Sequence, residues 1–338
     1  MKKILIIANA RYKGGLSGSD NIHINFAKYW SGKVTVKNLL WLDFKPFWLC
    51  YGLRIVVGIL IALVDFTRTD LVYSASDFLA DSIPAYIYKL KGAKWVAGFY
   101  LFAPREKKIY WHTQQFVKKL IKKHADIICI TNGSMKYEFL CKPTIEVNGG
   151  VDLEFCIDYA HKEYEAVFCG RIHETKGIKE LIKIWDIVTD DLPGAKLALI
   201  GDGDLGLNYV RNEMARYKYM DITLLGFMDK SRFKVYGESK LVLYTSTDNH
   251  FSMAPVEAMS CGCPMIAFDL LVMDTVKPHG TLLAKDCNKF AEYIKTLLTD
   301  DKAHTLLRKE AKDWADKWSW PEVATRVYKE IEHELYGL

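Results

Sequence analysis

The chain has 338 residues, about twice the usual size of one domain, so two domains are expected. Half of the residues are hydrophobic and 26% are charged, which excludes a disordered chain, a collagen and a small disulfide scaffold. The net charge of +5 is unevenly distributed: residues 1–160 carry 22 Lys/Arg against 13 Asp/Glu, whereas residues 161–338 carry 24 against 28. The two halves are therefore expected to meet different partners.

The cysteines and the N-terminus indicate the compartment. Eight cysteines are too few for a disulfide framework, and Cys129 and Cys169 lie in apolar runs. The Cys261–Cys263 pair lacks the further ligands of a zinc site, so no metal is expected there. The apolar run after Lys3 is too short for a signal peptide and favours a buried first strand. A cytoplasmic protein is expected.

The first half alternates apolar strand-like runs with helical stretches. A Gly/Ser loop that includes Gly14 and Gly15 follows the first run, and a helix is predicted near 21–30. This alternation is typical of βα units around a parallel sheet. Strands are predicted at 3–8, 34–40, 71–74, 95–100, 127–131 and 144–147.

Residues 46–66 are the most apolar stretch of the chain. Arg54 is its only cation, and it leaves 55–64 as an uninterrupted apolar core. Three interpretations are open: a helix buried against a sheet, an interfacial helix flanked by Trp41 and Trp48, or a membrane span. The interfacial interpretation predicts peripheral contact with a membrane.

The second half restarts the same alternation after an irregular, glycine-containing linker at 148–160. The economical architecture is α/β, with two Rossmann-like doubly wound domains facing each other across a cleft. The predicted domains are 1–152, completed by a crossover helix at about 320–338, and 160–319. Strands are predicted at 165–169, 197–200, 222–225, 241–244 and 264–267, and helices at 178–189, 206–216 and 290–315.

Two loops at predicted strand ends have the composition of anion sites. Gly14 and Gly15 would let backbone amides approach an anion, although the loop lacks a dinucleotide-binding fingerprint. In the loop that begins at Gly170, Arg171 offers a forked donor set and Lys176 a point charge, which together suit a diphosphate. A solvated turn is the alternative for each loop.

A third block, 247–264, contains a short predicted helix at 255–261, with Pro255 in its first turn. The helix N-terminus is expected to point toward the same ligand as Arg171 and Lys176. Glu257 is placed in the first helical turn, where its carboxylate either accepts hydrogen bonds from a ribose or interacts with the helix dipole.

These blocks together resemble the retaining, nucleotide-sugar-dependent glycosyltransferases of the GT-B fold, in the large family-4 group (glycosyl transferases group 1). The resemblance extends over nearly the whole chain, and its most specific part is the Pro255-Val256-Glu257-Ala258-Met259-Ser260-Cys261-Gly262 block.

The resemblance implies roles for individual residues. Arg171 and Lys176 would hold the donor diphosphate in place of a metal, and Glu257 would bind the ribose. No metal and no cofactor beyond the sugar nucleotide are implied. The remaining donor-binding residues would be Gly14, Gly15, Gly170, Gly201, Gly226, Phe227, Phe251, Ser252 and Met253.

Two positions depart from the family pattern. Asn249 stands where a first catalytic glutamate is usual, so the negative charge of that glutamate is missing. The region after the fourth strand has no histidine, and Tyr100 is the candidate substitute. A catalytically weak sugar-nucleotide-binding or scaffolding subunit is therefore the alternative to a hexosyltransferase.

The N-terminal half is expected to bind the acceptor. Arg105 and the lysines at 107–123, with the apolar 46–66 stretch, favour a glycan or lipid-linked acceptor near an anionic membrane surface; a solvated basic helix face is the alternative. Nucleic acid is not expected, because the basic stretch lacks interleaved aromatic residues and a recognised motif.

Overall fold

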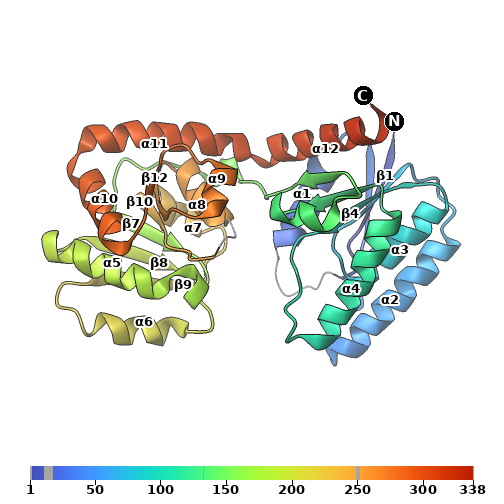
Figure 1. Cartoon of the computed structure of the whole chain (residues 1–338), viewed down its shortest axis with the longest axis horizontal. Helices are drawn as coiled ribbons and strands as arrows, with labels where there is room; N and C mark the ends of the chain where they lie inside the picture. The colour runs from blue at the N-terminus through green and yellow to red at the C-terminus, as the bar shows by residue number, and fades with distance from the viewer. Residues whose placement is uncertain (1, 11–17, 132, 249–251, 338) are drawn as a thin grey trace. The chain divides into compact units, whose positions relative to one another are not determined.

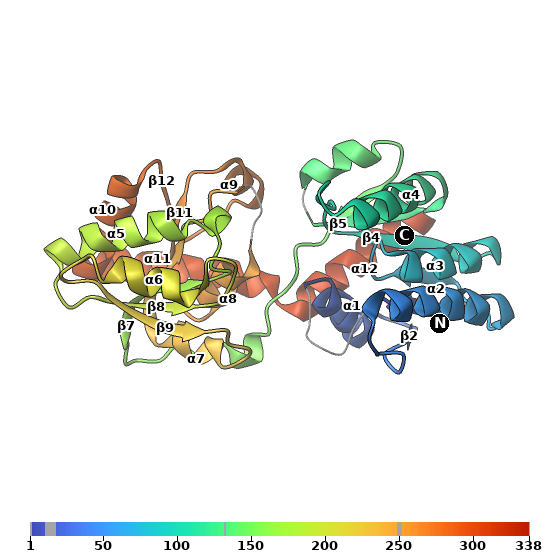
Figure 2. The same cartoon turned by 90° about the horizontal axis from the view of Figure 1, so that it is seen from below.

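The computed structural model describes residues 2–10, 18–131, 133–248 and 252–337. It divides the chain into two compact units, one formed by Met1–Gly150 with Trp320–Leu338 and the other by Val151–Ser319. Figures 1 and 2 show that each unit is a sheet with helices on both faces. The predicted α/β class with two doubly wound domains is confirmed.

The first unit is built on a parallel sheet of strand order β2-β1-β3-β4-β5-β6. One face packs against α1 and α12, and the other against α2, α3 and α4. Because both faces are covered, strands such as β5 read as continuous apolar runs. Its elements are β1 (Lys3–Ile7), α1 (Gly18–Tyr29), β2 (Lys33–Lys37), α2 (Phe47–Val64), β3 (Leu71–Ser74), α3 (Leu79–Leu90), β4 (Lys94–Phe99), α4 (Lys108–His124), β5 (Ile127–Ile130), η1 (Gly133–Phe139), β6 (Thr144–Glu146) and α12 (Trp320–Tyr336).

The second unit has a parallel sheet of order β12-β11-β10-β7-β8-β9. Helices α5, α6 and α10 cover one face, and α7, α8 and α11 cover the other. Its elements are η2 (Leu153–Phe155), β7 (Tyr164–Cys169), η3 (Glu174–Lys176), α5 (Ile178–Asp191), β8 (Lys196–Ile200), α6 (Gly206–Met214), β9 (Asp221–Gly226), α7 (Arg232–Gly237), β10 (Ser239–Tyr244), α8 (Met253–Ser260), β11 (Met265–Phe268), α9 (Leu271–Val276), β12 (Thr281–Ala284), α10 (Cys287–Thr299), α11 (Asp301–Ala315) and η4 (Asp316–Trp318).

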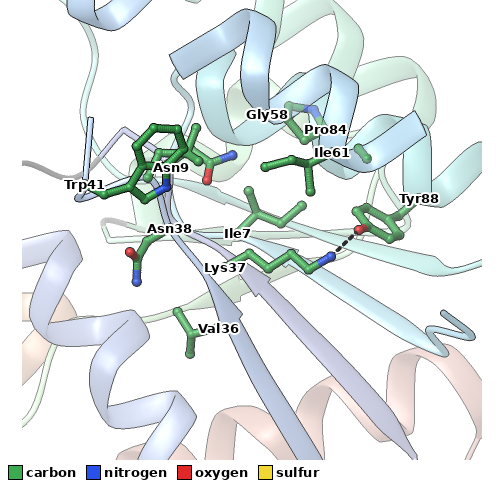
Figure 3. A pocket seen from close by; sticks show the side chains of 12 residues that line it. Ile7, Asn9, Val36, Lys37, Asn38, Trp41, Gly58, Ile61, Pro84 and Tyr88 are labelled. Atoms are coloured by element: carbon green, nitrogen blue, oxygen red, sulfur yellow. Dashed lines mark hydrogen bonds between the residues drawn. The ribbon is translucent and has the colours of Figure 1, made fainter. Parts of the chain in front are cut away.

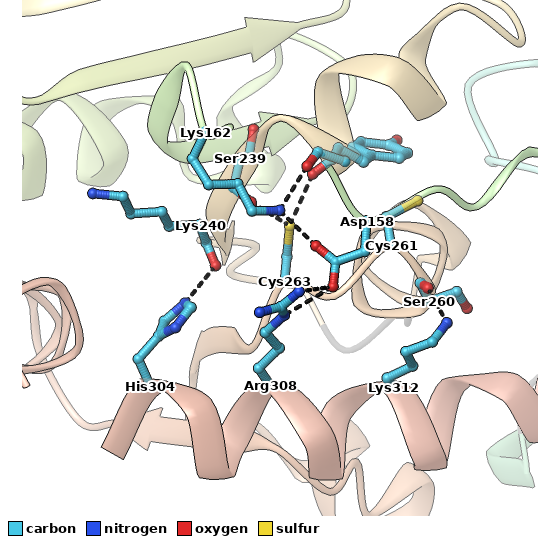
Figure 4. Close-up of polar contacts among 12 residues, drawn as sticks. Asp158, Lys162, Ser239, Lys240, Ser260, Cys261, Cys263, His304, Arg308 and Lys312 are labelled. Carbon is cyan, nitrogen blue, oxygen red and sulfur yellow. Dashed lines mark hydrogen bonds and ion pairs between the residues drawn. The ribbon is translucent and has the colours of Figure 1, made fainter. Parts of the chain in front are cut away.

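Polar contacts fasten α11 to the second unit (Figure 4). The Arg308 Nε donates to Asp158 at 2.8 Å, and the Lys312 ammonium donates to the Ser260 carbonyl at 3.0 Å. One turn earlier, the His304 ring is 3.1 Å from the Lys240 carbonyl. These contacts hold the long helix against the ends of α8 and β10.

Two predicted helices differ from the structure, and one strand was missed. The single helix predicted at 290–315 is wrong: α10 ends at Thr299, and Asp300 caps a separate α11 by accepting from the amides of Lys302 and Ala303, each at 3.0 Å. The helix predicted at 255–261 begins two residues earlier, at Met253, so Glu257 lies beyond the first turn. Strand β12 was not predicted.

The 46–66 stretch forms α2, which is not enclosed by the fold. Its inner face buries Cys50, Arg54, Gly58 and Ala62, whereas its outer face is exposed. The interpretation as a fully buried helix is therefore wrong. Among the described residues, α2 is the one helix that is long and apolar enough to cross a membrane, with a mean hydropathy of 2.3. Of its residues, 22% are buried inside the protein.

Candidate functional site

The loop after β7 carries the predicted cations and is fixed by its backbone. The amide of Gly170 donates to the Ile200 carbonyl at 3.0 Å, and the amide of the buried Ile172 donates to the backbone carbonyl of Asp202 at 3.1 Å. These bonds tie the loop to the end of the neighbouring strand β8. Arg171, between the two anchors, is exposed, and no described residue forms an ion pair with it. Its guanidinium is therefore free for a ligand.

Lys176 is held by the loop after β10. Its ammonium lies 3.3 Å from both carboxylate oxygens of Asp248 and 3.5 Å from the Ser246 hydroxyl. The amide of Thr247 donates to the Thr175 carbonyl at 3.0 Å, so backbone bonds also join the two loops. The ammonium is thereby positioned but keeps room for an anionic partner.

Gly177 makes this close approach feasible. Its φ is +67°, and a Cβ there would lie 1.7 Å from the carbonyl oxygen of Thr245. No side chain fits at that distance, and the left-handed backbone also favours glycine. The glycine therefore lets the loop that bears both cations meet the loop after β10.

Lys176 and Arg171 line one cavity of about 250 Å³. Ser252 closes it at the N-terminus of α8, where its hydroxyl accepts from the Ala254 amide at 3.4 Å. Burial raises the pKa of Tyr244, a further lining residue, to about 12, so its hydroxyl remains a donor at neutral pH. Two cations, hydroxyl groups and a helix N-terminus in one cavity form an anion-binding arrangement.

Three predicted glycines lie side by side at the ends of β7, β8 and β9. Gly201 has a φ of +140°, and a Cβ on it would lie 1.9 Å from the Gly170 carbonyl oxygen. Its amide donates to the Gly226 carbonyl at 2.8 Å. Phe227, which follows, is 83% exposed. At the carboxyl ends of β7, β8 and β9 the three glycines thus expose their backbone, and the exposed ring of Phe227 lies at its border.

Glu257 is paired with a residue that sequence reasoning missed. Arg232 in α7 donates to its two carboxylate oxygens at 2.7 and 2.8 Å, and the Tyr236 hydroxyl is 3.4 Å away. This bidentate pair fixes the orientation of the carboxylate. No local signal in the sequence reveals it, because 25 residues separate the two side chains.

Several predicted residues do not enter this geometry. Gly14, Gly15, Asn249 and Phe251 lie outside the described residues, so their roles stay predictions. Met253 begins α8 and packs partly against the core of the second unit.

The two predicted acceptor-side residues have different environments. The Tyr100 hydroxyl is hydrogen-bonded to that of Tyr73, and the ring packs against the core that includes α12. Arg105 is exposed in the turn before α4. The structure thus directs Tyr100 inward and Arg105 toward solvent.

Two buried carboxylates between β3 and the first turn of α3 were also missed. Asp77 accepts from Gln114 Nε2 at 2.6 Å, and Asp81 accepts from the Ala10 amide at 2.9 Å and the Ser76 hydroxyl at 2.5 Å. Burial raises the pKa of Asp77 to about 6 and that of Asp81 to about 7. Their place directly after a predicted strand was the signal that could have found them.

The Cys261–Cys263 pair is structural. Both thiols are buried, and the Cys263 thiol donates to the carbonyls of Tyr236 and Ser239 at 3.1 and 3.3 Å. Among the described residues, no group of three or more His, Cys, Asp or Glu side chains is arranged to hold a metal ion.

Residues 163–300 match the family model described as "Glycosyl transferases group 1". The chain is 26% identical over 168 residues to a poly(glycerol-phosphate) alpha-glucosyltransferase of Bacillus subtilis, in an alignment covering 47% of this chain and 24% of that protein. It is 24% identical over 175 residues to the sulfoquinovosyl transferase SQD2 of Arabidopsis thaliana, covering 48% and 32% respectively. The chain thus spans a third or less of the length of these relatives.

Solved structures are similar over the whole chain. Anabaena Alr3699/HepE, solved with UDP and glucose, has a TM-score of 0.71 at 16% identity, with 98% of this chain and 100% of that chain covered. A sucrose-phosphate synthase of Thermosynechococcus elongatus has a TM-score of 0.74 at 15% identity, with both chains fully covered. At these identities the likeness shows the fold, which is GT-B.

The match at residues 163–300 confirms the predicted resemblance where the cation-lined cavity lies. The chain has the GT-B fold and carries a glycosyltransferase group 1 domain in its second unit.

Proposed function

We propose that the protein transfers a hexose from a nucleoside-diphosphate sugar to an acceptor hydroxyl, with retention at the anomeric carbon. The observation that carries this proposal is the cavity lined by Arg171 and Lys176 at the N-terminus of α8. Its charge and donors suit a diphosphate. Relatives named as glycosyltransferases and a structural neighbour solved with UDP-glucose support the donor class.

In this proposal the two cations stabilise the leaving group. The bond between the anomeric carbon and the phosphate oxygen breaks, a bond to the acceptor oxygen forms on the same face, and the acceptor proton passes to a phosphate oxygen. Charge then accumulates on the diphosphate, where Lys176 and Arg171 need no reorganisation to stabilise it. No metal or further cofactor is assigned a role.

The remaining donor contacts follow from the fixed elements. Arg232 orients the Glu257 carboxylate toward the ribose hydroxyls, and is a positioning residue. The backbone at Gly170, Gly201 and Gly226, with Phe227, borders the base and phosphates, while Ser252 and Met253 present the first amides of α8. Asn249 lies where a charged carboxylate is usual, which favours a slower transfer.

The test is nucleotide release from a panel of UDP-, GDP- and ADP-sugars. Lys176→Ala is expected to reduce turnover about 10²–10³-fold, the usual effect of removing one preorganised donor. Lys179→Ala is the matched control. Lys179 lies in the first turn of α5 and pairs with the exposed Glu174, so its removal should leave turnover unchanged.

Thermal unfolding is the control for folding: the midpoints of both variants should equal that of the wild type. Equal turnover in the Lys176→Ala variant contradicts the proposed role. Donor binding without turnover on any donor and acceptor favours the non-catalytic, scaffolding alternative.

We further propose that the acceptor is lipid-linked or close to a membrane, so that the protein acts at an anionic bilayer surface. The outer face of α2 exposes a stripe at helical spacing, Leu49, Leu53, Val56, Leu60 and Leu63. Trp48 and Phe47 at its start suit the interface, and the exposed Lys45 adds positive charge. Arg54, the one charge within the helix, points inward and leaves the stripe uncharged.

Flotation with vesicles that contain anionic lipid tests this contact. The double variant Leu53→Glu, Val56→Glu should lose most of the bound fraction. The double variant Leu271→Glu, Leu306→Glu, which adds the same charge at exposed apolar positions of α9 and α11, should not. Unchanged flotation of the α2 double variant contradicts membrane contact through α2 and leaves the donor chemistry unaffected.

A further inference from the structure

A second cavity, of about 340 Å³, lies in the first unit between the inner face of α2 and the sheet (Figure 3). Ile7 and Lys37, the last residues of β1 and β2, form its floor. It therefore opens at the carboxyl ends of parallel strands, where sheets of this kind bind ligands. Its size falls within the range of small-molecule pockets, roughly 300–1,000 Å³.

Gly58 lets α2 pack closely beside the cavity. A Cβ at this position would lie 2.8 Å from the side-chain nitrogen of Asn9 and 3.2 Å from Pro84, so a larger residue would push these neighbours away. One turn later, Ile61 and Ala62 line the cavity.

A buried charge holds the cavity wall in place. The Arg54 side chain is fully buried, and its Nε donates to the Leu42 carbonyl at 2.7 Å while Nη1 donates to the Asn9 carbonyl at 3.3 Å. These bonds fasten the segment after β2 to α2. That segment contributes Leu39 and Trp41 to the lining, and Trp41 remains two-thirds exposed.

Three polar residues of the cavity, Lys37, Tyr88 and Asn9, already have hydrogen-bond partners in the protein. The Lys37 ammonium pairs with Asp65 and donates to the Tyr88 hydroxyl at 2.8 Å, which in turn donates to Asp65 at 2.5 Å. The Asn9 side chain donates to the Ala80 carbonyl at 3.0 Å. A polar ligand would have to break these bonds, whereas an apolar one gains contact with hydrocarbon walls and needs none of them.

We propose that this cavity binds the hydrocarbon chain of an amphiphilic molecule, and that this molecule is the acceptor. The chain lies among Ile7, Leu39, Ile61, Ala62 and Pro84, and its polar head emerges beside Trp41. The acceptor assignment rests on the proposed transferase function; the binding of the chain does not.

A series of alkyl glucosides of rising chain length, each below its micelle concentration, tests the binding by calorimetry. Burying one methylene is worth about 0.8 kcal/mol, so affinity should rise about fourfold per added methylene until the cavity is full. Ile61→Trp fills the cavity from α2 and should flatten this series. Leu90→Trp, at an exposed position of α3 outside the cavity, should preserve it.

Thermal unfolding of Ile61→Trp checks that the variant is folded. Should Ile61→Trp prove unfolded, Ala62→Leu gives a smaller filling with the same expected flattening. A chain-length series that is flat in the wild type, or equally steep in the folded filling variant, overturns the binding of the chain.

The acceptor assignment is tested with a donor that the wild type hydrolyses. Octyl glucoside should raise the rate of nucleotide release at least several-fold over glucose. Ile61→Trp should raise the KM for octyl glucoside, whereas Leu90→Trp, outside the cavity, should leave this KM and the hydrolysis of the donor alone unchanged. Chain binding without this acceleration overturns the acceptor assignment. Chain binding in a protein that hydrolyses no donor contradicts the proposed function and leaves the cavity assignment in force.

Discussion

The two units, both parallel sheets but with different strand orders, place opposite charges at the point where strand order reverses. In the second unit this point lies between β7 and β10, and its loops present Arg171 and Lys176 to a cavity. In the first unit it lies between β1 and β3, where the carboxylates of Asp77, in the loop after β3, and Asp81, in the first turn of α3, are buried. The unit with the more acidic sequence thus carries the cation site, and the more basic one buries acids. Local placement of a few side chains, and not bulk charge, decides what a strand end can bind.

The largest expected effect tests the ion pair that orients Glu257. Arg232→Met leaves a mostly buried carboxylate without its bidentate partner, so we expect a loss of about 3–5 kcal/mol in the free energy of unfolding. Denaturant unfolding measures it. The double variant with Glu257→Gln should recover part of this loss, because it removes the unpaired charge. A double variant less stable than Arg232→Met would show that the pair is not the cause.

The buried acids of the first unit should give stability an unusual pH dependence. Burial raises the pKa of Asp81 to about 7, so the folded state holds a proton between about pH 4 and 7 that the unfolded state has released. The proton on Asp81 therefore lowers the free energy of unfolding as pH rises through that window, by up to about 4 kcal/mol.

Asp81→Asn removes the titrating group and keeps an oxygen for the Ala10 amide. As pH rises from 4 to 7, the free energy of unfolding of the variant should therefore increase relative to that of the wild type. Denaturant unfolding at each pH measures the difference. Parallel profiles would mean that Asp81 does not hold its proton in the folded state, and the contrast between the two units would weaken.

Two glycine variants separate backbone strain from close approach in the second unit. Gly177→Ala should cost about 3 kcal/mol or more, because the left-handed backbone and the contact with the Thr245 carbonyl both penalise a side chain. Gly194 also has a positive φ, of +90°, but nothing lies within 4 Å of an added Cβ. Gly194→Ala should therefore lower the free energy of unfolding by only about 1–2 kcal/mol. Equal losses in denaturant unfolding would contradict the role of Gly177 in joining the loops.

The smallest expected effect concerns the break between α10 and α11. Asp300→Ala removes the cap on two amides of α11 and should cost about 1 kcal/mol. Asp301→Ala, in the first turn, removes a charge but no cap and should cost only a few tenths. Thermal unfolding of the two variants should therefore differ, and equal midpoints would exclude the capping explanation.

Much of the fold could be predicted because both sheets are covered on both faces. Each strand predicted from an apolar run is present, and no strand end is shifted by more than three residues. The loop of Arg171 and Lys176 could be found for the same reason, since it directly follows such a run. The helix break at Asp300 was missed because the apolar period continues across it, and a single capping aspartate decides between one helix and two.

Contacts between residues far apart in the chain could not be predicted from the sequence. Arg232 meets Glu257 only because α7 packs beside α8, and Lys176 meets Asp248 only because β10 lies next to β7. The close approach of α2 to Asn9 and Pro84 at Gly58, beside the cavity, is likewise a contact that no spacing of residues encodes. Sequence patterns specify which elements form, whereas tertiary packing selects the partner of each charge.

The boundary between the units bears on the order in which they can fold during synthesis. The second unit begins at Val151 and ends at Ser319, and these two residues pair with each other, with the Val151 amide 2.8 Å from the Trp318 carbonyl. It is thus an insertion whose ends meet, and it can complete itself once Ser319 has left the ribosome. The first unit starts earlier but needs Trp320, Val327 and Ile331 of α12 to close its core. The half that is translated first should therefore be the last to acquire its native stability, and until then its apolar face awaits α12.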